Sequence, residues 1–246
     1  MNPAAEPVIR IGMLTPSSNT VLEPVTARML HAVPGVTAHF ARFRVTEIGM
    51  GSASQAQFDL SPMLAAAQLL ADARCSAICW GGTSAGWLGA ERDRELCAAI
   101  EARTGIRATS AVLSLLQAFR AANVGRYALV TPYVREVQEA VIAQLDKAGF
   151  ECTAERHGGR SVNFEFSQIG RDEIAAMMRA VAKPKPDAIV VLCTNMDGAS
   201  LAETIESECG TLVLDSIAVA LWGTMHICGA DRARLAGWGR LFRELG

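Results

Sequence analysis

The chain has 246 residues, of which 50% are hydrophobic and 20% are charged, the composition of an ordinary globular protein. Its formal net charge of −2 comes without a stripe of Lys or Arg, so nothing in the charge pattern favours nucleic-acid binding. No apolar stretch reaches the roughly 18 residues that span a bilayer, which argues against a membrane protein.

The cysteines and the N-terminus indicate the compartment. Seven cysteines, an odd number without CxxC spacing, argue against a disulfide framework and against a zinc site. Four scattered histidines have no ligand spacing, so no metal is expected. The first ten residues lack the basic start and apolar core of a signal peptide. We expect a cytoplasmic protein with reduced thiols.

Short apolar runs alternate with stretches of helical periodicity along the chain. The first half predicts, in order, strand 8–14, helix 20–30, strand 37–43, helix 62–73, strand 76–80 and helix 91–104, which Gly105 ends. The pattern restarts with a strand near 106, helix 111–123, strand 127–131, helix 134–148, strand 152–157, helix 173–182 and strands 188–192 and 212–214. A buried helix is predicted from Ser216 onward.

Strands separated by helices of about 10 to 15 residues predict βαβ units and parallel sheets. The expected fold class is α/β, with two pseudo-twofold-related lobes, each a parallel sheet flanked by helices. We predict that residues 1–110 plus 216–246 form the first lobe and residues 111–215 the second. Ligands of such sheets bind beyond the carboxyl ends of the strands, so the cleft between the lobes is the expected active site.

An internal repeat supports the two lobes. Residues 77–84 (AICWGGTS) resemble residues 188–195 (AIVVLCTN), and Thr15-Pro16 is repeated as Thr131-Pro132. Each longer copy is an apolar run that ends in a small residue, Thr and a second polar residue. Gly82 stands where the other copy has Cys193. If the two copies face each other, one side of the cleft presents a thiol and the other presents none.

Cys193 is the candidate catalytic residue. It follows a predicted strand, and we expect Thr194 and Asn195 after it to lie near a helix start. Backbone N–H groups and the helix dipole would then lower the thiol pKa and suit it to acid/base chemistry. The alternative is a small buried hydrophobic residue, as most free cysteines are. Thr194, next in the chain, is a candidate substrate-binding residue.

Polar residues at the other strand ends are candidate substrate ligands. Gly82, Thr83 and Ser84 offer N–H groups and hydroxyls for a carboxylate or an enolate, although an ordinary turn would have the same composition. Ser17 and Asn19 lie in PSSNT, a stretch that either binds an anion or caps a helix.

Two further candidates come from the second half of the chain. Tyr133 follows Thr131-Pro132 and would supply a phenol. Asn163 follows a loop-like stretch, GGRSV, that either reaches the cleft or is a surface turn. The chain has no P-loop, GxGxxG or GxSxG motif, so nucleotide binding and triad hydrolysis find no support.

On these residues, almost the whole chain, from Ile11-Gly12-Met13 to GWGRLF at 237–242, resembles the aspartate/glutamate racemase superfamily. Within it the chain is similar to the maleate isomerase and arylmalonate decarboxylase branch. The resemblance implies two lobes around the substrate and no cofactor. It also implies a cysteine on each lobe in racemases and isomerases, at the positions of Gly82 and Cys193. In the family's isomerases, Asn19, Tyr133 and Asn163 match substrate-binding positions, whereas Gly82-Thr83-Ser84 resembles the decarboxylase.

The missing first-lobe thiol divides the possible reactions. Two-base racemisation and thiolate addition to maleate both need a group that Gly82 lacks. One thiol can still protonate the enediolate left when a malonate-like acid loses CO₂, and this decarboxylation is the leading hypothesis. The alternatives are an isomerase or racemase acting on a small dicarboxylate, and a non-catalytic diacid-binding protein. The sequence leaves the substrate and the oligomeric state open, a homo-oligomer included.

Overall fold

Two four-stranded parallel sheets with the same strand order form the framework of the protein. The structure, a computed structural model, describes residues 8–245. The first sheet has the order β2-β1-β3-β4 and consists of β1 (Ile9–Pro16), β2 (Val36–Phe43), β3 (Ala77–Trp80) and β4 (Ala108–Ser110). The second has the order β6-β5-β7-β8 and consists of β5 (Arg126–Tyr133), β6 (Glu151–Arg160), β7 (Ala188–Val191) and β8 (Leu212–Asp215). The repeat seen in the sequence is therefore a repeat of the fold, and the predicted α/β class with two similar lobes is confirmed.

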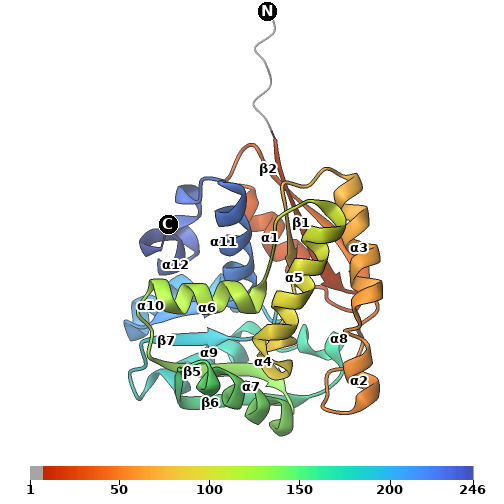
Figure 1. Ribbon diagram of the computed structural model, residues 1–246. Coiled ribbons are helices and arrows are strands. Elements are labelled where there is room, and N and C mark those ends of the chain that lie inside the picture. The colour runs from red at the N-terminus through yellow and green to blue at the C-terminus, as the bar shows by residue number, and fades with distance from the viewer. Residues whose placement is uncertain (1–7, 246) are drawn as a thin grey trace, which may run out of the picture.

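Helices surround both sheets (Figure 1). Those up to β5 are α1 (Leu22–Leu30), α2 (Ser52–Ala56), α3 (Leu60–Asp72), α4 (Ala85–Leu88), α5 (Ala90–Thr104) and α6 (Ala111–Ala121). Those after β5 are α7 (Arg135–Lys147), α8 (Asn163–Phe166), α9 (Arg171–Ala182), η1 (Ala199–Leu201), α10 (Ala202–Cys209), α11 (Ser216–Cys228), η2 (Ala233–Trp238) and α12 (Arg240–Glu244). None of the helices within residues 8–245 is long and apolar enough to cross a membrane.

Helices α6 and α11 occupy equivalent places in the two halves of the fold. Each helix directly follows the last strand of its sheet, and the two pack against each other at the centre of the molecule (Figure 1). Their backbones approach closely because Gly223 of α11 faces Ser114 of α6, where any Cβ at Gly223 would overlap the serine hydroxyl. Beyond this contact, α11 also packs on β3 and β4 of the first sheet, whereas α12 packs on β8 of the second.

The structure differs from the sequence-based elements around β6. This strand was predicted over 152–157 but extends to Arg160, so Gly158 and Gly159 lie in a strand and not in a loop. A register irregularity between Thr131 and Tyr133 of β5 permits the longer pairing. Gly158 lies against the neighbouring strand, where an added Cβ would be 3.1 Å from the carbonyl oxygen of Pro132.

The two lobes meet where the strands of both sheets end. Across this junction α4 packs on α7. The loop after β2 pairs with the segment before α8 through an antiparallel bridge between Glu47 and Val162, and the Ile48 N–H donates to the Ser161 carbonyl at 2.8 Å. The short helices α2, α4 and α8, which the periodicity did not predict, all lie in segments that adjoin this junction.

Candidate functional site

The carboxyl ends of four strands line one cavity between the lobes. The cavity has a volume of about 20 Å³, which is room for about one water molecule and too little for a dicarboxylic acid. Its walls must therefore move apart to admit a ligand of that size. Of the predicted site residues, the cavity brings together Gly82, Thr83, Ser84, Tyr133, Asn163, Cys193 and Thr194.

Cys193 lies two residues beyond β7 with its side chain buried. The backbone N–H of Asn195 donates to Sγ at 3.3 Å, and the nearby Tyr133 hydroxyl also favours the thiolate form. Burial outweighs both contacts and raises the pKa of the Cys193 thiol to about 12.

The expectation of a lowered thiol pKa at a helix start is therefore wrong. The residues after Cys193 form turns, and the next helical residue is Ala199. No helix dipole acts on the sulfur, and desolvation decides the protonation state. The consequence for chemistry is that this cleft holds a protonated thiol, which is a proton donor.

Tyr133 connects the thiol to the first lobe. It is the last residue of β5 and is buried. Its hydroxyl shares a hydrogen bond of 2.7 Å with Thr83 Oγ1. Burial raises the pKa of the Tyr133 phenol well above its ordinary value, and the nearby Cys193 sulfur acts in the same direction. The phenol stays protonated and can donate to a carboxylate.

The first-lobe side of the cavity carries Ser84 and Trp80. Ser84 precedes α4, and its hydroxyl accepts a hydrogen bond of 3.4 Å from Trp80 Nε1. The Trp80 indole fills the space beside Gly82, so that a Cβ at Gly82 would overlap the ring. The space into which a side chain at position 82 would project is thus occupied by an aromatic ring.

Ser17 and Asn19 do not line the cavity. The Asn19 side chain caps α1 by accepting from the N–H groups of Val21 and Leu22. Its amide nitrogen donates to Thr194 Oγ1 at 3.0 Å. Ser17 Oγ bonds to the backbone of Val45. The capping alternative accounts for the contacts of this stretch in the structure, and substrate binding by Ser17 and Asn19 stays a prediction.

Asn163 and Thr194 line the cavity, but their side chains also join the two lobes. Asn163 is the first residue of α8, not part of a surface turn, and its Nδ2 donates to Ser18 Oγ at 2.7 Å. Thr194 Oγ1 donates to the Gly81 carbonyl at 2.8 Å. Both side chains therefore hold the cleft together in this state.

Asn195 is a residue of the site that the sequence reasoning did not select. Its side chain accepts from the Thr20 N–H at 2.9 Å and donates to the Asn163 carbonyl at 2.6 Å, while its backbone N–H contacts the thiol. The signal was present, because Asn195 occupies in the second repeat the place of Ser84 in the first.

An apolar wall completes the cavity, and the sequence did not predict which residues form it. It consists of the side chains of Pro16, Val45, Ile48, Phe58, Trp80 and Trp87. The aromatic members stack edge to face, with the ring centroids of Phe58 and Trp87 5.9 Å apart. These residues come from separate segments, so no local pattern in the sequence marks them as one surface.

Two α/β lobes with the same strand order, and a cysteine in the cleft between them, define the class of the aspartate/glutamate racemase-like proteins. Within this class, residues 11–242 match the family model described as arylmalonate decarboxylase, and the chain belongs to that family.

Individual relatives include two different enzymes. The chain is 29% identical to a maleate isomerase of Nocardia farcinica, over 96% of both sequences. It is 25% identical to an arylmalonate decarboxylase of Bordetella bronchiseptica, over 99% of this chain and 100% of the relative. A solved structure of the Nocardia farcinica maleate cis-trans isomerase, with a covalently bound succinylcysteine intermediate, superposes with a TM-score of 0.88 at 26% identity. The superposition covers 96% of this chain and 99% of the isomerase chain.

Proposed function

We propose that the protein is a cofactor-independent decarboxylase of a malonate-like dicarboxylic acid, with Cys193 as the proton donor. The observation that carries the proposal is that Cys193 is the one thiol within residues 8–245 that lines the cavity. Burial keeps it protonated, and it faces a first-lobe wall on which the Trp80 ring fills the space beside Gly82. Such a cleft delivers a proton to one face of a carbon and has no thiol on the other face.

The polar and apolar parts of the cavity suit the two carboxylates of such a substrate. One carboxylate would accept hydrogen bonds from Thr83, Ser84 and Tyr133, which would stabilise the charge that develops as the enediolate forms. The other would lie against the apolar wall formed by Val45, Phe58 and the other side chains named above. An apolar environment disfavours a carboxylate relative to neutral CO₂ and so favours its departure.

The proposed reaction needs no reagent other than a proton from solvent. The bond between the α-carbon and the departing carboxylate breaks, CO₂ leaves, and the electron pair stays with the α-carbon as an enediolate. The Cys193 S–H bond then breaks and its proton goes to the α-carbon, giving the monocarboxylate and a thiolate. The thiolate takes a proton from solvent, because its pKa of about 12 makes it a strong base.

The second candidate is isomerisation of maleate, which the 29% identity to a maleate isomerase favours. That reaction needs a thiolate that adds to the double bond. In this cleft the available sulfur is Cys193, and burial opposes its ionisation. The third candidate is a protein that binds diacids without turning them over.

A substrate comparison separates the three functions. Phenylmalonate should release CO₂ and give phenylacetate, whereas maleate should not give fumarate. Fumarate formation without CO₂ release would replace the proposal by the isomerase. Binding of phenylmalonate or maleate without turnover of either would favour the non-catalytic protein.

A further inference from the structure

A buried carboxyl group on α5 has no role in the mechanism above. Asp93 is 2% exposed, and its Oδ2 atom lacks a hydrogen-bond partner within the described residues 8–245. The nearby Ser110 hydroxyl favours the ionised carboxyl, but burial dominates and raises the pKa of Asp93 to about 7. Because buried polar atoms are almost always paired, an unpaired carboxyl oxygen calls for an explanation.

A small cavity joins Asp93 to the catalytic cavity. Asp93 and Ser84 both line a space of about 10 Å³, about the volume that one water molecule needs. Phe58, Trp80 and Ser84 line this space and the catalytic cavity alike. Ser84 therefore stands between the Asp93 carboxyl and the place proposed for the substrate.

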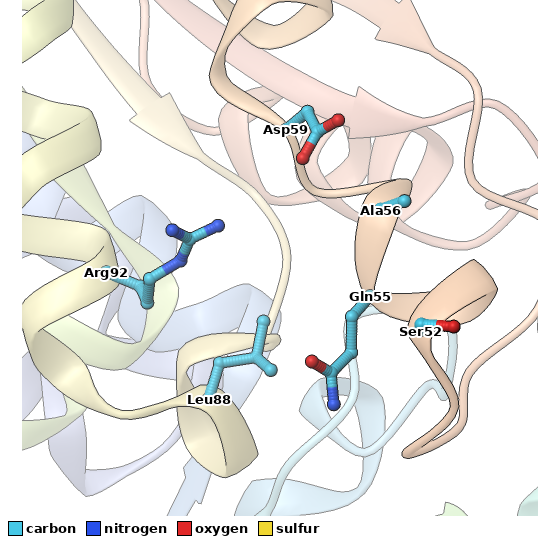
Figure 2. Close-up of a pocket in the computed structure, with 6 residues that line it drawn as sticks. All are labelled: Ser52, Gln55, Ala56, Asp59, Leu88 and Arg92. Carbon is cyan, nitrogen blue, oxygen red and sulfur yellow. The ribbon is translucent and has the colours of Figure 1, made fainter.

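On its other side, the small cavity adjoins a surface pocket of about 450 Å³. Figure 2 shows Arg92 and Leu88 on one side of this pocket and Gln55 and Asp59 on the other. Arg92 and Leu88 line both the pocket and the small cavity. Asp93 thus lines the middle one of three spaces that share lining residues, the outermost of which is open to solvent.

The protonation state of Asp93 decides which way the Ser84 hydroxyl points. A hydroxyl donates one hydrogen bond and accepts two, and Ser84 Oγ already accepts from Trp80 Nε1. A protonated Asp93, donating through one water in the small cavity, would fill the second acceptor position and direct the Ser84 hydrogen into the catalytic cavity. An ionised Asp93 accepts instead, turns that hydrogen away and brings a negative charge toward a dianionic substrate.

We propose that Asp93 is a positioning residue, which in its protonated form holds the Ser84 hydroxyl as a donor toward the substrate carboxylate. The inference rests on the proposed function, since it needs a carboxylate in the cavity. Asp93 sets the charge and the hydrogen-bond direction of the first-lobe side, while Cys193 supplies the proton on the other side.

Among the titratable groups around it, Asp93 is the one whose pKa lies near neutrality. Cys79 of β3 and Cys97 of the same helix are buried thiols, whose pKa values burial and the Asp93 charge raise above the ordinary thiol range. Ser110 of β4 does not titrate, and the Arg92 guanidinium lines the small cavity. The neutral form of Asp93 is therefore lost as the pH rises past about 7.

The test compares the pH profiles of wild type, Asp93→Asn and Asp93→Ala. Wild-type kcat/KM for phenylmalonate should fall above about pH 7, by up to about tenfold per pH unit if the proton is obligatory. Asn carries a permanent N–H donor, so Asp93→Asn should remove this fall, whereas Asp93→Ala should be slow at every pH. An Asp93→Asn profile that falls like wild type, or an Asp93→Ala variant as fast as wild type, would overturn the inference.

A binding measurement separates this inference from the decarboxylase itself. If phenylmalonate is not decarboxylated, the proposed function fails. Malonate binding to the same three proteins is then measured by calorimetry. Two buffers of different ionisation enthalpy give the number of protons taken up on binding. Proton uptake on binding above about pH 7 in wild type and its absence in Asp93→Asn would support the role of Asp93. Equal proton uptake in both proteins, or no binding of malonate, would reject it.

Discussion

The indole ring of Trp80 occupies the space into which a side chain at Gly82 would project. A Cβ built on Gly82 would overlap the six-membered part of the ring, and even Cε2 would be only 2.6 Å away. Glycine at position 82 and tryptophan at position 80 therefore depend on each other. The ring also donates to Ser84, so the side chain that fills the space beside Gly82 takes part in the hydrogen bonding of the cavity.

This overlap predicts that Gly82→Cys alone does not create a two-sided enzyme. Overpacking of this kind costs about 1–3 kcal/mol, so the variant should have a lower free energy of unfolding. A double variant, Trp80→Leu with Gly82→Cys, removes the overlap and should racemise 2-phenylpropionate, with Trp80→Leu alone as the control. Denaturant unfolding and chiral chromatography measure the two effects. A stable, racemising Gly82→Cys single variant would contradict the steric argument.

Cys193→Ala should abolish most of the decarboxylation, because no other thiol within residues 8–245 lines the cavity. Loss of a positioned proton donor costs about 10²–10⁴-fold in kcat. Cys209→Ala, a half-buried thiol outside the cavity, is the matched control and should keep the wild-type rate. The decisive measurement is CO₂ release from phenylmalonate. A Cys193→Ala variant within a few-fold of wild type would rule out the thiol as donor.

Replacing Tyr133 by Phe should slow turnover through the loss of one donor to the developing enediolate. Removal of one such donor typically lowers kcat by about 10²–10³-fold. The pair with Thr83 is also lost, so Thr83→Val should not add its full effect in the double variant. Tyr127→Phe is the control, because the Tyr127 hydroxyl is buried, unpaired within the described chain and outside the cavity. If Tyr127→Phe and Tyr133→Phe slow the reaction equally, the effect is one of packing.

The sequence predicted the fold through local signals and the site through its repeat. Gly105 does end α5, with φ at 71°, and the apolar run after Ser216 is the buried helix α11. Gly82 and Cys193 face one cavity, as the repeat suggested. The residues of the apolar wall and the place of Asp93 could not be predicted, because they depend on contacts between distant segments. The thiol pKa was predicted in the wrong direction because desolvation depends on the whole tertiary structure.

Asp215 should make the stability of the protein fall as the pH rises. This residue caps α11 by accepting from the N–H groups of Ile217 and Ala218, and its burial raises the pKa to about 8. Above about pH 4 the unfolded chain releases the Asp215 proton while the folded chain keeps it, so the free energy of unfolding decreases with pH until about pH 8. The loss is on the order of several kcal/mol.

Asp215→Asn isolates this effect, because the amide oxygen still accepts from both N–H groups but cannot ionise. The difference in unfolding free energy, variant minus wild type, should grow between about pH 4 and about pH 8 and then level off. Asp187→Asn is a control whose stability difference should have the opposite sign. The N–H groups of Arg126 and Gly125 lower the pKa of the exposed Asp187 carboxyl, so its ionised form stabilises the fold. Wild type should be the more stable protein of that pair once Asp187 is ionised. Urea unfolding across the pH range measures both differences, and a constant difference for Asp215→Asn would show that the buried carboxyl is not held protonated.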